Sequence, residues 1–137
     1  MKPFRFCLLR LAMLSLLALP ALGQAAQWAR LSGGAGKTFY IDKSSVTKVD
    51  TLRKVWTMQS FGKEQSTPDG KAYRSLKELH LYSCDDRTTT LLSQVYYPDA
   101  MGKGEPVGNF KYERFAPEDI VPDSAYDSAL TVVCKRP

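Results

Sequence analysis

The sequence predicts an α+β domain, in which an antiparallel β-sheet meander of about five to six strands carries one C-terminal α-helix tied to the sheet by a disulfide. Three observations lead to this prediction. Apolar and polar side chains alternate along several segments of the middle of the chain, the pattern becomes helical after residue 122, and a pair of cysteines remains once a leader is removed.

Residues 1–25 predict a secretory signal peptide. Basic residues come first, an apolar run covers residues 11–19, and small residues occupy positions 23 and 25. The apolar run is shorter than the roughly 20 residues that cross a bilayer, so we expect cleavage and no transmembrane segment afterwards. Cys7 lies upstream of the small residues, and no lipid anchor is therefore expected. The exported chain would be periplasmic or secreted, and surface display stays open.

Removal of the leader changes the charge balance. It holds three of the 19 basic residues and none of the 14 acidic ones, so residues 26–137 carry a net charge of only +2. This balance argues against nucleic-acid binding, which needs a cationic excess on one face. At 44% hydrophobic and 24% charged residues the chain is not disordered, and residues 26–137 predict one domain with one modest core.

The first two strands are predicted at residues 28–32 and 38–42, on either side of the glycine-rich turn 33–36. No helix follows the glycines, which argues against a phosphate-binding loop. Asp42 begins a second turn through Ser45, because its side chain can accept backbone hydrogen bonds.

A three-stranded meander is predicted next, over residues 52–61, 75–84 and 87–97. Alternation places Trp56 and its even-numbered neighbours on one face of the first of these strands. Residues 62–73 contain glycine, proline and many charges, and predict a solvated loop or long hairpin connection.

The C-terminal third contains an irregular loop at 98–109, a short last strand at 110–115 and one helix. Ser124 is the expected N-cap of this helix of about three turns. Its buried stripe is expected to comprise Tyr126, Ala129, Leu130, Val133 and Cys134.

Cys84 and Cys134 are predicted to form a structural disulfide, because Cys7 leaves with the leader and the compartment is oxidising. A zinc site would need four ligands, and beyond these cysteines the chain offers His80 alone. A redox pair would need the cysteines in a C-x-x-C arrangement.

No catalytic residue, metal site or cofactor is predicted. His80 has no titratable partner at a fixed spacing, and Asp85-Asp86 is expected to be a hairpin turn. No serine lies in a G-x-S-x-G motif, and we expect the chain not to be an enzyme.

Two groups of residues are candidates for binding a protein. Basic residues gather early in the chain, and aromatic residues flank the loop at 98–109, as at many protein interfaces. Solvated strand edges and core packing are competing explanations for both groups. The candidate binding residues are Lys43, Lys48, Arg53, Lys54, Tyr97, Lys103 and Phe110.

Several short motifs, taken in order, resemble one known family. They are Trp28, Phe39-Tyr40-Ile41-Asp42 with Ser45-Val46, Lys54-Val55-Trp56, Tyr82-Ser83-Cys84 with Arg87, Tyr96-Tyr97 before Met101-Gly102-Lys103-Gly104, and Pro122-Asp123-Ser124 leading to Val132-Val133-Cys134. The sequence is similar to the surface-adhesin protein E family over nearly all of residues 26–137.

The resemblance implies an antiparallel sheet with a C-terminal helix tied to it by a disulfide. It also implies a non-enzymatic, extracytoplasmic protein that binds host extracellular-matrix proteins such as vitronectin or laminin, with a homodimer through sheet edges or faces as one arrangement. The alternative is a periplasmic accessory domain that binds an envelope protein or a small ligand.

Overall fold

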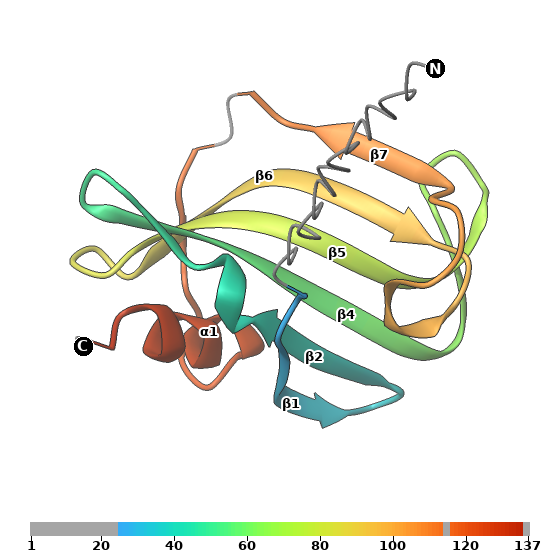
Figure 1. The fold of residues 1–137 in the computed structure, drawn as a ribbon, viewed down its shortest axis with the longest axis horizontal. Helices are drawn as coiled ribbons and strands as arrows, with labels where there is room; N and C mark the ends of the chain where they lie inside the picture. Colours follow the sequence, from blue (N-terminus) through green and yellow to red (C-terminus); the bar gives the residue numbers. More distant parts are fainter. Residues whose placement is uncertain (1–24, 114–115, 136–137) are drawn as a thin grey trace, which may run out of the picture.

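The computed structural model describes residues 25–113 and 116–135 as an antiparallel sheet with one C-terminal helix (Figure 1). The predicted signal peptide lies outside these residues, apart from its last position. An eight-stranded sheet has the main order β1–β2–β4–β5–β6–β7, while β3 also pairs with β4 and β8 with β6. The predicted fold class is confirmed.

The elements follow the chain as a meander. The strands are β1 (Trp28–Gly34), β2 (Lys37–Asp42), β3 (Thr47–Val49), β4 (Leu52–Ser66), β5 (Ala72–Ser83), β6 (Thr88–Tyr97), β7 (Gly108–Lys111) and β8 (Glu118–Asp119). Two short 3₁₀ helices, η1 (Lys43–Ser45) and η2 (Ala100–Gly102), and the α-helix α1 (Ala125–Val133) complete the described structure.

The predicted loop at 62–73 is mostly wrong, because β4 and β5 continue through it and only residues 67–71 turn. Thr67 makes this tight turn possible. Its backbone N–H donates to the Lys71 carbonyl at 2.8 Å, and its hydroxyl accepts from the Lys71 N–H at 2.9 Å and donates to the Asp69 carboxylate at 2.6 Å. Lys63 and Glu64 are therefore exposed strand residues, whereas Asp69 and Lys71 lie in the turn.

Smaller differences occur at three places. β1 extends through Gly34, so the first turn is shorter than predicted. The strand predicted at residues 110–115 is instead β7 at Gly108–Lys111, and residues 114–115 lie outside the described part of the chain. The short strands β3 and β8 were not predicted, because two or three residues cannot establish an alternation.

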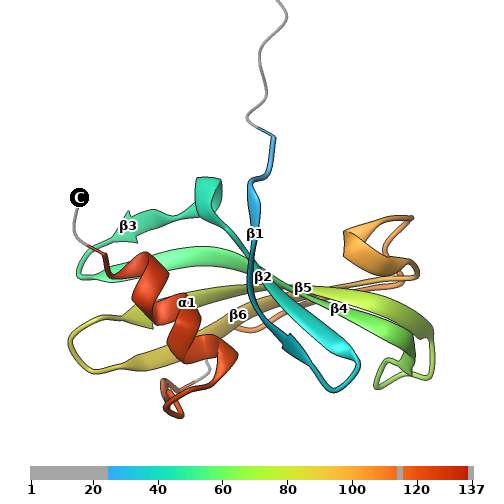
Figure 2. The ribbon, with the colours of Figure 1, turned by 90° about the horizontal axis from the view of Figure 1, so that it is seen from below.

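The sheet has two different faces, and Figure 2 shows α1 lying across one of them. We call this the helix face and the opposite one the outer face. As predicted, consecutive residues of β4 separate: Val55 pairs with His80 on the helix face, and Trp56 pairs with Leu79 on the outer face. The main buried cluster lies under the helix and comprises Ile41, Val55, Tyr82, Ile120, Ala129, Leu130 and Val133.

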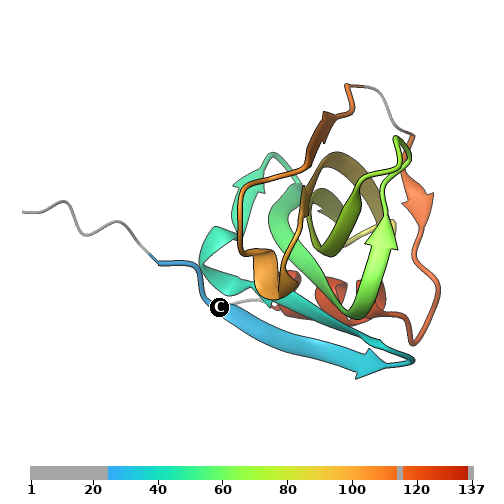
Figure 3. The same cartoon turned by 90° about the vertical axis from the view of Figure 1, so that its right-hand side faces the viewer.

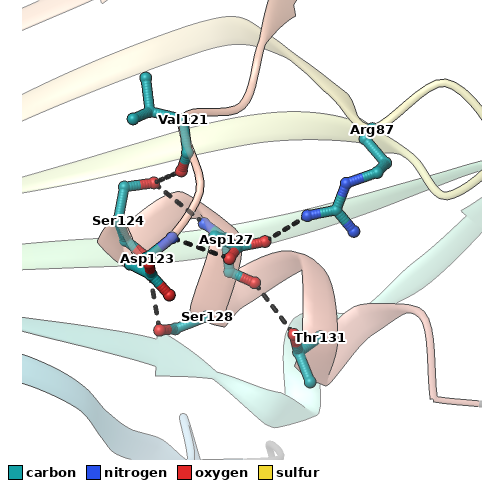
Figure 4. Close-up of polar contacts among 7 residues, drawn as sticks. All are labelled: Arg87, Val121, Asp123, Ser124, Asp127, Ser128 and Thr131. Carbon is teal, nitrogen blue, oxygen red and sulfur yellow. Dashed lines mark hydrogen bonds and ion pairs between the residues drawn. The ribbon is translucent and has the colours of Figure 1, made fainter.

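The first turn of α1 is held by side chains (Figure 4). The Ser124 hydroxyl caps the helix as predicted, accepting from the Asp127 N–H at 3.2 Å. The Asp127 carboxylate accepts from the Asp123 N–H at 3.0 Å and pairs with the Arg87 guanidinium at 2.6 Å. The backbone N–H of Asp123, and then Arg87, lower the pKa of this carboxyl.

The other end of α1 is joined covalently to the sheet. Cys134 ends the helix and forms the predicted disulfide with Cys84, with a Cα–Cα distance of 5.7 Å. Arg87 and Cys84 both belong to the β5–β6 turn, which therefore holds α1 at its beginning and at its end.

Candidate functional site

The four basic candidates do not all share a surface. Lys43 lies on η1. Lys48 of β3 pairs with Arg53 of β4, so the side chains of Lys48 and Arg53 lie on the same face of the sheet. Lys54, the neighbour of Arg53, points to the opposite face. None of the four forms a salt bridge with a residue in the described part of the chain.

The aromatic candidates also separate. Tyr97 pairs with Ser75 on the outer face, whereas Phe110 pairs with Gln94 on the helix face and packs edge-on against Tyr96 at 5.7 Å. Lys103 is exposed just after η2. The structure therefore does not join Tyr97 and Phe110 into one patch.

The outer face carries a group of half-buried side chains that we call the aromatic strip, comprising Trp28, Trp56, Lys77, Leu79, Val95 and Tyr97. A hollow of about 270 Å³ and a groove of about 750 Å³ adjoin along it. Trp56, Val95 and Tyr97 line both. An uncovered sheet face is usually polar, so this composition is unusual.

Lys77 is the central cation of the aromatic strip. Its ammonium lies 5.6 Å from the Trp28 ring centroid and 4.8 Å from the Tyr97 ring centroid. Its stem passes so close to η2 that a Cβ on Gly102 would overlap its Cε atom. The rings attract the ammonium and η2 confines the stem, so the charge is held at the strip.

η2 is fixed to the outer face beside the aromatic strip. The Met101 N–H donates to the Ser60 hydroxyl at 3.1 Å, and the Gly102 N–H donates to the Ser75 hydroxyl at 2.8 Å. The Ser75 hydroxyl in turn donates to the Asp99 carbonyl at 2.5 Å. The loop that follows β6 is thereby anchored to the sheet.

Of the aromatic strip, the sequence predicted only Tyr97 as a binding residue. Alternation did place Trp56 on the face opposite Val55, but it could not show which face the helix would cover. Trp28 and Lys77 come from strands that are not neighbours in the sheet, and a single-strand pattern does not bring them together.

The helix face contains a half-open cavity of about 640 Å³ beside the start of α1. Glu78 and His80 of β5 form its floor, Glu118 and Asp119 of β8 line it, and Tyr126 of α1 closes one side. Leu91, Ile120 and Val121 contribute apolar surface.

Glu78 is only 4% exposed, and its carboxylate accepts hydrogen bonds from two side-chain amides. One carboxylate oxygen accepts from the Gln59 side chain at 2.9 Å, and the other accepts from the Gln94 side chain at 2.9 Å. The Gln94 carbonyl oxygen accepts from the Tyr112 hydroxyl at 2.7 Å, which fixes the amide.

His80 is 3% exposed, and its Nδ1 atom has no hydrogen-bond partner among the described residues. Its ring packs edge-on against Tyr126, with 5.4 Å between centroids. Burial lowers the pKa of His80 below its usual value, and the nearby Glu78 and Glu118 oppose this shift only in part. The imidazole is therefore neutral at pH 7.

Asp85 and Asp86 occupy the predicted hairpin turn and are exposed. The Asp86 N–H donates to the Ser83 hydroxyl at 3.1 Å, which closes the turn. Within residues 25–113 and 116–135, no group of three or more histidine, cysteine or acidic side chains is arranged to hold a metal ion.

The sequence profile of the surface-adhesin protein E family matches residues 28–135, which is most of the chain. The chain belongs to this family. Solved structures of Haemophilus influenzae protein E have a similar fold. One aligns with a TM-score of 0.62 at 19% identity, covering 78% of this chain and 83% of that one. A second crystal form aligns with a TM-score of 0.64 at 18% identity, covering 85% and 93%.

No curated protein matches the sequence. Membership of the surface-adhesin protein E family makes the chain an adhesin-like binding protein of an exported surface family. The one α-helix of the described residues is too short to cross a bilayer.

Proposed function

We propose that the protein binds a host extracellular-matrix protein, such as vitronectin or laminin, and that the aromatic strip is the contact surface. The half-buried tryptophans and Tyr97 beside the confined cation Lys77 carry this proposal, because large aromatic side chains provide most of the binding energy at protein interfaces. Family membership supports the class of partner.

Charge indicates the kind of surface that fits. Lys54, Lys77 and Lys111 all lie on the outer face, by their pairing with Thr47, Met58 and Ser93. Asp42 on the same face is buried and accepts from the Gln27 N–H and the Ser44 N–H, so it is already satisfied. Among the described residues, Glu113 is the one acidic residue that lines the groove, so the lysines outnumber it, and an acidic segment with apolar side chains would complement this face.

Two matched substitutions test the contact surface. Tyr97→Ala removes a half-buried ring from the outer face, and Phe110→Ala removes one from the helix face. Binding to immobilised vitronectin and laminin should weaken about tenfold or more for Tyr97→Ala and little for Phe110→Ala. Equal effects, or no binding to either protein, would contradict the proposal.

Two measurements separate this proposal from its alternatives. Sedimentation of the free protein shows whether it is a monomer, in which case no second copy competes for the outer face, or a homodimer. Protease treatment of intact cells, with a periplasmic marker to report leakage, shows whether the protein meets a host at all. Complete protection would favour an envelope protein as the partner.

A further inference from the structure

We propose that the cavity on the helix face binds a small organic cation, an amine with an apolar body. This site is separate from the aromatic strip, so either proposal can fail without the other. The cavity volume of about 640 Å³ lies in the range of small-molecule sites.

The charges of the residues that line the cavity favour a positively charged ligand. Glu78, Glu118 and Asp119 line the cavity, and the described lining includes no lysine or arginine. Glu78 is almost fully buried, and its described contacts are with neutral amides and no cation. A buried carboxylate without a counter-charge favours a cationic ligand.

His80 is the second, independent observation. It lines the same cavity, is 97% buried, and its Nδ1 atom has no partner among the described residues. A buried polar atom without a partner is uncommon in a folded protein. An ammonium group that enters the cavity and reaches this nitrogen would donate a hydrogen bond to it, because a neutral imidazole is an acceptor.

The other residues that line the cavity favour a ligand with an apolar body. Leu91, Ile120, Val121 and the Tyr126 ring surround the carboxylates. A ring or short alkyl chain would replace water against these side chains while the ammonium faces Glu78.

The single histidine of the chain gives a readout specific to this site. Benzylamine, benzyl alcohol and benzoate share a ring and differ in charge, so they serve as probes. In ¹H–¹⁵N spectra of the purified protein, benzylamine should shift the His80 ring signals saturably. Benzyl alcohol should bind about tenfold more weakly or worse, and benzoate should leave the signals unchanged.

Substitutions then test the carboxylates. Glu118→Gln and Asp119→Asn change exposed residues, and each should weaken benzylamine binding about two- to fivefold. Glu105→Gln, an exposed glutamate outside the lining, should have no effect. Glu78→Gln should weaken binding about tenfold or more, and the two exposed variants keep the test decisive if this one does not fold.

Three results would overturn the proposal. The His80 signals could remain unchanged with benzylamine at millimolar concentration, or respond equally to benzyl alcohol. Binding could also be insensitive to Glu118→Gln and Asp119→Asn together.

Discussion

The two faces of the sheet differ in which kinds of side chain they bury and which they expose. Beside the apolar cluster under α1, the helix face also buries charged and polar side chains, and Glu78 and His80 are almost fully buried there. The outer face leaves Trp56, Leu79 and Tyr97 half-exposed with no helix over them. Buried charged groups and apolar groups facing solvent both depart from the usual pattern of a two-layer domain. The two binding proposals made above rest on these two departures.

The largest effect on stability is expected from breaking the disulfide that holds α1 on the helix face. The Cys84–Cys134 bridge closes a separation of 50 residues, which in the chain-entropy model is worth about 4 kcal/mol. Reduction, or the double substitution Cys84→Ser/Cys134→Ser, should therefore lower the urea midpoint of unfolding substantially. Equal midpoints with and without reductant would show that packing alone holds α1.

A matched pair of leucines compares the faces directly. Leu130 of α1 is 3% exposed, whereas Leu79 is half-buried on the outer face. Leu130→Ala should cost about 2–5 kcal/mol, because it leaves a cavity in the core, and Leu79→Ala about 1 kcal/mol or less. Chemical denaturation of both variants provides the measurement. A larger loss for Leu79→Ala would mean that the outer face belongs to the core.

Acidification should act on the helix face through His80. Its pKa is lowered in the folded state from the usual value of 6.5, so the unfolded chain binds more protons below about pH 6.5. Stability should fall as pH drops from 6.5 to the lowered pKa, with a slope of at most about 1.4 kcal/mol per pH unit. His80→Gln should remove this slope.

Carboxylates act in a different window and serve as an internal reference for the His80 measurement. Hydrogen bonds from Thr67 and from the Asp123 N–H lower the pKa of Asp69 and Asp127 below 3.8. Their contributions are lost only as pH falls below about 4, and His80→Gln should keep that loss. A slope near pH 6 that persists in His80→Gln would assign it to another group.

The sequence predicted elements whose signals are local. Alternation identified β4, β5 and β6, and Ser124 with the apolar stripe after it identified α1. The disulfide followed from the cysteine count and the expected compartment. β3 and β8 are too short to show a period, and they form because β4 and β6 offer them free edges.

The candidate sites were harder to predict, because they combine distant segments. Glu78 and His80 share a face by their spacing of two, yet their cavity is completed by residues of β6 and of the segment 116–126. The aromatic strip likewise needs the register of β1, β5 and β6 before Trp28, Lys77 and Tyr97 can meet. Among the predicted binding residues, Tyr97 alone lies in the strip.

The C-terminal end of α1 is attached to the β5–β6 turn of the curved sheet (Figure 3), and this attachment has a consequence for biogenesis. A chain that is exported from its N-terminus presents Cys84 to the oxidising compartment 50 residues ahead of Cys134. During that interval the Cys84 thiol has no partner within the domain, and it can form mixed disulfides with other thiols. Correct pairing then depends on exchange, which favours Cys134 once the sheet has formed and α1 docks beside it. The yield of native protein should therefore depend on the thiol–disulfide oxidoreductases of the cell that exports it, and it should fall when they are absent.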